Sequence, residues 1–268
     1  MTNAPARPAA PRLVSARQWT GLLLATTALG AGMAEARMGP PVMVGDQTVW
    51  VAATEGGEGG EAGAVAGVDA DTAYVVRLAI VEGHLLAAAA LYRAGMVDDA
   101  IGLSYHPEAE MMDEVRETLA AHGQADFTPL MQAFSTAMEG GAADVMPELA
   151  AFQIAVAGAI GADAPDAAKR FAVSVAVLRA AAAEYAGSIE GGVVTDVLAY
   201  HEAQAFVDVA RGMVVGIVGQ ERLVTRAVAA MDPAAEAFAM VDGAFAARDP
   251  AILLGVAARV ELISSQVR

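Results

Sequence analysis

The 268-residue chain has no cysteine, and that absence removes a whole group of chemistries. Disulfide bonds, thiolate zinc sites, iron–sulfur clusters, c-type haem attachment and cysteine nucleophiles all need a thiol. Common enzyme motifs are missing too: there is no G-x-S-x-G, H-E-x-x-H, phosphate-binding loop or dinucleotide fingerprint. We therefore expect a protein that is not an enzyme.

Basic residues are scarce. Lys169 is the only lysine, and 32 acidic residues against 16 basic ones give a formal net charge of −16. Nucleic acids and anionic membrane surfaces are bound through lysine and arginine, so neither is an expected partner. Small cations or basic protein patches suit such a surface better, although a charge of this size also serves solubility.

The N-terminus has the three parts of a secretory signal peptide. Three arginines precede an apolar run from Gly21 to Met33, and Ala34 to Ala36 form a cleavage site of the A-x-A type. The run is shorter than the roughly 20 residues that span a bilayer. We predict a Sec-type signal peptide at residues 1–36, no later membrane span, and a periplasmic or secreted protein. The alternative is a tether formed by an uncleaved N-terminal helix.

Residues 37–68 are predicted to be a flexible linker. They contain a Pro pair and the Gly/Glu-rich stretch "TEGGEGGEAGAVAG", which cannot bury a core. A short strand is expected around Thr48 to Ala52.

Residues 69–268 carry the apolar spacing of three and four that is typical of helices. The chain is 56% hydrophobic but only 5% aromatic. Alanine supplies much of the hydrophobic content, and it favours closely packed helices. The first helix opens at Asp69 with residues that suit an N-cap, and Gly95 follows its end. A second begins at His106 and runs to about Ala121. We predict an all-α domain, an antiparallel bundle of six to eight helices.

Two segments, at about 86–116 and 180–211, resemble each other. Their clearest parts are "LSYHPEAEMMDEVR" and "LAYHEAQAFVDVAR", which share a Tyr-His pair followed by Asp and Arg at matching offsets. Duplication would make the domain two related helical hairpins. Chance similarity in an Ala-rich sequence is the alternative.

A metal site is predicted at the first of these segments. His106 and Glu110 are four residues apart, so their side chains can lie on one helical face. Imidazole and carboxylate together bind iron and other transition metals, whereas Met111 and Met112 would favour copper. If the helix of His84 packs antiparallel to that of His106, His84 supplies a third ligand. Alternatively, His106 only opens a helix and Glu110 only complements the helix dipole.

His201 is the fourth candidate metal ligand. It has Ala205 where the first segment has Glu110, so the segments bind unequally or His201 joins a shared site. The alternative is a buried histidine satisfied by a hydrogen bond. His122 is expected to cap a helix end, and the tyrosines are expected to be core rings with hydroxyls in water.

The stretch "AAAEYAGSIEGGVVTDVLAYHEAQAFVDVARGMV" resembles a helical hairpin in the periplasmic portions of some bacterial high-affinity iron permease family proteins. The likeness covers about 35 residues and rests on Tyr185, the Gly192-Val193 turn and the segment from Ala203 to Phe206. The membrane helices and acidic iron motif of the permeases are absent, so transport itself is not implied.

A fainter similarity connects Gly83-His84 to the G-x-H-x-x-E motif of imelysin-like periplasmic iron-associated proteins, which are helical bundles. Ala87 stands where the motif has its glutamate, and Gln204 stands there after His201. Together the two resemblances imply a periplasmic helical domain connected with metal uptake.

Two functional hypotheses follow. In the first, an exported protein binds an ion, iron before copper, through His84, His106 and Glu110, with His201 as a further candidate ligand. In the second, the bundle binds no ligand and holds a periplasmic protein partner through its acidic surface or an apolar groove.

Overall fold

The structure is a computed structural model that describes residues 42–44, 47–49, 63–162, 165–238 and 248–267. The predicted signal peptide, residues 1–36, lies outside the described residues, as does most of the predicted linker. The chain divides into two compact units, Met1–Ala53 and Thr54–Arg268.

The first unit contains one described feature, a short antiparallel strand pair. Strand β1 (Val42–Val44) pairs with β2 (Gln47–Val49), with Val42 opposite Val49. β2 therefore overlaps the start of the strand expected around Thr48 to Ala52.

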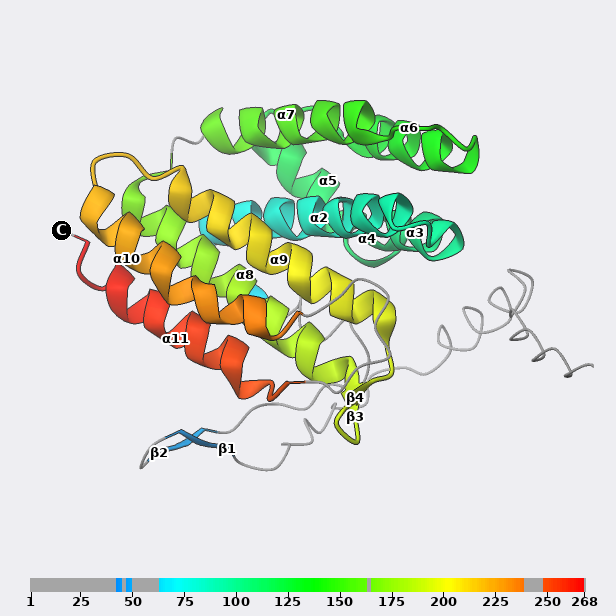
Figure 1. Ribbon diagram of the computed structural model, residues 1–268. Helices are drawn as coiled ribbons and strands as arrows, with labels where there is room; N and C mark the ends of the chain where they lie inside the picture. The colour runs from blue at the N-terminus through cyan, green and yellow to red at the C-terminus, as the bar shows by residue number, and fades with distance from the viewer. Residues whose placement is uncertain (1–41, 45–46, 50–62, 163–164, 239–247, 268) are drawn as a thin grey trace, which may run out of the picture. The chain divides into compact units, whose positions relative to one another are not determined.

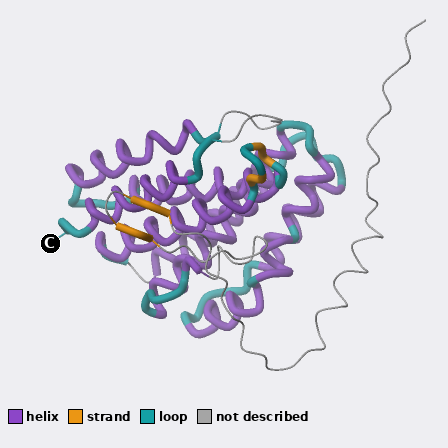
Figure 2. Tube along the Cα trace, turned by 90° about the horizontal axis from the view of Figure 1, so that it is seen from below, coloured by secondary structure: helices purple, strands orange, loops and turns teal. Residues whose placement is uncertain are grey.

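The second unit confirms the predicted all-α bundle, and helices make up most of its described residues (Figure 2). Its elements are α2 (Ala70–Arg93), α3 (Val97–Ser104), α4 (His106–Glu110), α5 (Met112–Ala121), α6 (Thr128–Glu139), α7 (Met146–Ala162), α8 (Ala167–Gly187), β3 (Ile189–Glu190), β4 (Val193–Val194), α9 (Val197–Val215), α10 (Glu221–Met231), the 3-10 helix η2 (Asp232–Glu236) and α11 (Ala251–Ser264).

Helix α2 is the centre of this unit. It packs against α3, α4, α5, α7, α8 and α9, with α6 and α7 along one side and α8 to α11 along the other (Figure 1). Its predicted ends are confirmed: the Asp69 side chain accepts a hydrogen bond from the Thr72 amide at 3.0 Å, and Gly95 has a φ of 84°.

By length and composition, α2 is the one described helix that could cross a membrane. However, 78% of its most apolar 18-residue window is buried inside the unit. The core helix of a folded domain passes the same test, and the burial of α2 against six other helices accounts for its composition.

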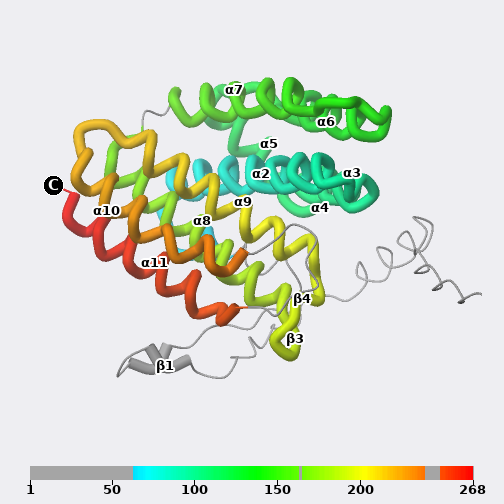
Figure 3. The backbone as a smooth tube through the Cα atoms, in the orientation of Figure 1, coloured from blue at the N-terminus to red at the C-terminus, as the bar shows by residue number. Residues whose placement is uncertain are grey.

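The other half of the bundle is built on the pair α8 and α9, which lie side by side and are joined by the β3–β4 hairpin (Figure 3). Gly191 and Gly192 form its two-residue turn and both have positive φ, which suits a tight hairpin. The buried hydroxyls of Tyr185 and Tyr200 both donate to the Ala237 carbonyl, at 3.1 and 3.3 Å. These two tyrosines are core rings as expected, but the expectation of hydroxyls in water was wrong for them.

Several helix boundaries differ from the prediction. The helix expected from His106 to about Ala121 is interrupted at Met111, where φ is −140°. Residues 97–104 form a helix, α3, that the prediction did not include. Helices α9 and α10 are separated by a turn in which Gly219 has a φ of 78°. Described helical segments are consequently shorter and more numerous than the six to eight predicted.

The two similar segments have different secondary structures. Residues 86–116 run from the end of α2 through α3 and α4 into α5, whereas residues 180–211 run from α8 through the β3–β4 hairpin into an unbroken α9. Duplication stays a prediction.

Candidate metal centre

Three of the four predicted metal ligands come together in the structure. His84 lies on α2, and His106 and Glu110 are the first and last residues of α4. Each offers a ligand atom, and the three atoms lie within 4.8 Å of one another. The packing of α4 against α2 thus brings His84 to the His106–Glu110 pair.

The short helix α4 fixes the spacing of its two side chains. Pro107 lies in its first turn, where a missing backbone N–H costs nothing. One helical turn later Glu110 returns to the same side, and its Oε1 lies 3.6 Å from His106 Nδ1. Its Oε2 lies 3.9 Å from His84 Nε2.

Glu202 on α9 is a member of the cluster that sequence reasoning missed. Its Oε1 lies 2.9 Å from His84 Nδ1 and 3.2 Å from His106 Nδ1. A signal was present in the sequence, because Glu202 lies in the same helical row as Phe206 and Val209, at spacings of four and seven. All three are buried, and a carboxylate in such an apolar row needs a partner.

His201, the fourth predicted ligand, does not belong to this group of atoms. It is buried, and its ring is nearly perpendicular to that of Tyr200, with 5.2 Å between ring centroids. Consecutive residues on a helix point about 100° apart, so His201 and Glu202 face different neighbours. His122 is the C-cap of α5, as expected, and stacks on Tyr74 at 4.0 Å.

Close packing of α2 and α9 at Gly83 positions the cluster. A Cβ atom built on Gly83 would lie 2.3 Å from Phe206 Cδ1, closer than real Cβ contacts. Phe206 in turn packs edge-on against the His84 ring, with centroids 5.5 Å apart. The missing side chain of Gly83 therefore lets α9 approach near enough for Glu202 to reach His84.

The electrostatics of the cluster are set by the buried Glu202. Burial alone would raise the pKa of this carboxyl, but His84 and His106 outweigh it and lower the pKa to about 2. The hydrogen bond to Glu202 raises the pKa of His106, against the opposing effect of burial. Hydrogen bonds from the two imidazoles to an ionised Glu202 thus hold the cluster together.

An ionised Glu202 selects the tautomer of His84. The carboxylate can only accept, so Nδ1 of His84 carries the hydrogen and its Nε2 has the lone pair in the neutral ring. Nε2 is the atom on the Glu110 side. A carboxylate on one ring nitrogen, with the other ring nitrogen directed toward the metal position, is the arrangement that orients histidine ligands in metal proteins.

The group of donor atoms suits a transition metal ion. Two imidazole nitrogens and a carboxylate are the ligand set of non-haem iron sites and of many zinc sites. Two ligand atoms that each lie about 2.1 Å from one ion are at most about 4.2 Å apart, so the separations of 3.6 and 3.9 Å are compatible with a shared ion. An ion would replace the proton on His106 Nδ1, which now lies against Glu202 and Glu110.

The cluster is open on one side. The side chains of His84 and Glu202 are 1% and 7% exposed, whereas those of His106 and Glu110 are 34% and 24% exposed. An ion would therefore enter past α4, with α2 and α9 forming the closed wall behind it.

Comparison with protein-family models, with curated proteins and with solved structures found no match to this chain.

Proposed function

We propose that this chain is an exported, non-catalytic helical protein that binds one transition metal ion, iron first and copper second, between α2, α4 and α9. His84 Nε2, His106 Nδ1 and the Glu110 carboxylate are its ligands, and Glu202 orients His84. The observation that carries the proposal is the 2.9 Å contact between Glu202 and His84 Nδ1, because it directs Nε2 to the two side chains on α4.

The donor types favour iron over copper. Nitrogen and oxygen ligands suit iron, whereas thioether sulfur suits copper in its reduced form. Met112, which the sequence offered as a copper ligand, is fully buried within the hydrophobic core, and Met111 packs against that core. The resemblances to periplasmic iron-associated proteins and the A-x-A site after the apolar N-terminal run support the placement of this function outside the cytoplasm.

Elemental analysis of the full chain, expressed and purified under mild conditions from the periplasm, tests the proposal. Affinity measured in vitro is a poor guide to the natural ion, since copper binds most N/O sites more tightly than iron does. We expect about one equivalent of iron, and a rise in melting temperature when the metal-free protein is titrated anaerobically with Fe(II). No shift with iron, copper or zinc would contradict the proposal and favour a ligand-free protein that holds a partner.

His106→Ala is the decisive variant, because His106 is partly exposed and its loss leaves the core intact. The metal content is expected to fall well below half of the wild-type value. His122→Ala is the matched control, since it removes a histidine that lies outside the cluster. Equal metal loss in both variants would show that the ion does not bind at the cluster.

A further inference from the structure

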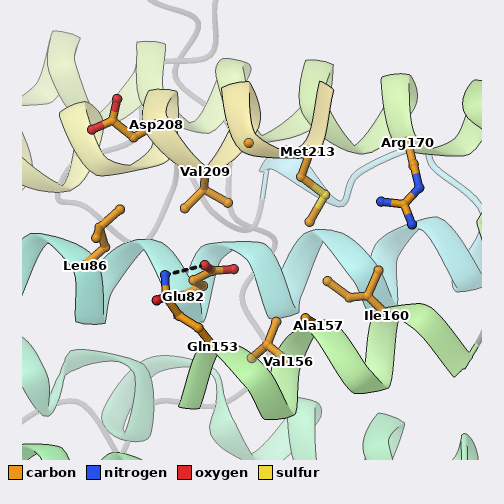
Figure 4. Close-up of a pocket in the computed structure, with 11 residues that line it drawn as sticks. Glu82, Leu86, Gln153, Val156, Ala157, Ile160, Arg170, Asp208, Val209 and Met213 are labelled. Carbon is orange, nitrogen blue, oxygen red and sulfur yellow. Dashed lines mark hydrogen bonds between the residues drawn. The ribbon is translucent and has the colours of Figure 1, made fainter. Parts of the chain in front are cut away.

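A second candidate site also lies between α2 and α9. A groove of about 480 Å³ runs between α2, α7 and α9. Its volume falls within the range of pockets that hold small molecules. Figure 4 shows Asp208 and Arg170 at opposite ends of the groove, with Glu82 and Gln153 between them.

Glu82 is the group that the packing of the bundle does not explain. It is a partly buried carboxylate, and it accepts a hydrogen bond from the neutral amide of Gln153, at 2.9 Å. Among the described residues no cation forms an ion pair with Glu82, and its hydrogen-bond partner is a neutral amide. A buried carboxylate without a cation is costly for the protein alone, but it is a strong attachment point for a positively charged ligand.

The walls beside Glu82 are apolar. Val156 and Ile160 from α7 face Val209 and Met213 from α9, and Met213 reaches toward α2 (Figure 4). A methionine side chain adapts to differently shaped apolar ligands. These walls would cover the stem of a ligand whose charged head lies at Glu82.

Arg170 sets a limit on that ligand. Its guanidinium lies at the other end of the groove, and its Nε donates to the Pro165 carbonyl at 3.3 Å. A second positive charge on the ligand would approach Arg170 and be repelled. A molecule with one ammonium group therefore fits better than a diamine of the same length.

We propose that this groove binds an aliphatic monoamine, with its ammonium group on Glu82 and its stem between α7 and α9. Asp208 at the rim adds negative charge near the same end. The inference is independent of the metal site, because the groove shares no side chain with the His84 cluster.

Calorimetric titration of the full chain with octylamine, below its micelle concentration, tests the proposal. Octanoate has the same stem with the opposite charge, and 1,8-diaminooctane has a second ammonium group. We expect octylamine to bind at least tenfold more tightly than either. Equal binding of octylamine and octanoate would overturn the role of Glu82, and equal binding of the diamine would overturn that of Arg170.

Two variants separate the groove from general attraction to an acidic protein. Glu82→Gln keeps the size of the side chain and its contact with Gln153. This variant should lower the affinity for octylamine at least tenfold. Glu190→Gln removes one exposed carboxylate elsewhere and should leave binding within twofold of wild type. Equal effects of these two changes would show that binding is unspecific.

Ala157→Phe tests whether the aliphatic stem of the ligand lies in the groove. Ala157 lines the groove but is exposed, so a phenylalanine there fills the groove without disturbing the core. Loss of octylamine binding with an unchanged melting temperature is expected. Retained binding in this variant would place the amine elsewhere and overturn the proposal.

Discussion

Gly83→Ala is the sharpest test of how the bundle builds its metal centre. The new methyl group would lie 2.3 and 2.6 Å from two carbon atoms of the Phe206 ring, so α9 or the ring must move. Overpacking of this kind costs about 1–3 kcal/mol. Alanine regains about 1 kcal/mol as the better helix former, so we expect a net loss of up to about 2 kcal/mol in the free energy of unfolding.

Gly158→Ala is the matched control for this substitution. Gly158 lies within α7, and a Cβ atom built there meets nothing within 4 Å. The same change should therefore stabilise the protein by up to about 1 kcal/mol. Urea unfolding of both variants gives the two free energies under identical conditions.

A double-mutant cycle identifies the clash itself. Phe206→Leu removes the ring atoms that the new methyl group meets, so the cost of Gly83→Ala should be smaller in that background. Because Phe206 also packs against His84, Gly83→Ala should weaken iron binding while Gly158→Ala leaves it unchanged. The reasoning is refuted if Gly83→Ala stabilises the protein as much as Gly158→Ala does, or if Gly83→Ala costs the same in the wild-type and Phe206→Leu backgrounds.

Two further predictions concern carboxylates. Glu202→Gln keeps an acceptor for His84 Nδ1 but removes the charge that makes this histidine a strong ligand. Iron affinity should therefore fall about 10–100-fold in a competitive chelator titration. With Glu190→Gln as the control, an affinity that is unchanged in both variants would show that Glu202 does not contribute to the site. Burial raises the pKa of Glu82 above 4.5, so the folded state holds the proton of this carboxyl more tightly than the unfolded state does. Wild-type stability is therefore lost as pH rises from 4.5 through the folded pKa. Glu82→Gln should accordingly stabilise the protein more at pH 7 than at pH 4 in urea unfolding, and a gain independent of pH would contradict this.

Half of the metal cluster was accessible from the sequence because it depends on local geometry. The i, i+4 spacing of His106 and Glu110 places them on one side of any helix, and Pro107 marks where that helix starts. His84 needed the added assumption that two helices pack together, which the structure confirms. These three residues lie on α2 and α4, two helices that are close together along the chain.

Glu202 could not be found in this way, because it comes from a helix that begins more than a hundred residues after His84. The choice between His201 and its neighbour depended on the rotation of α9, and a step of one residue turns a side chain by about 100°. That rotation is set by the contact of Phe206 with Gly83, a fact of packing rather than of local sequence.

By itself, the sequence determined the all-α class, the ends of α2 and the His106–Glu110 pair, because capping, periodicity and helical spacing act over a few residues. Only the tertiary structure decided that Glu202 joins the two histidines, that Met112 belongs to the core, and that Glu82 faces a groove. Each of those outcomes depends on which helix faces which, and that is settled by the packing of side chains far apart in the chain.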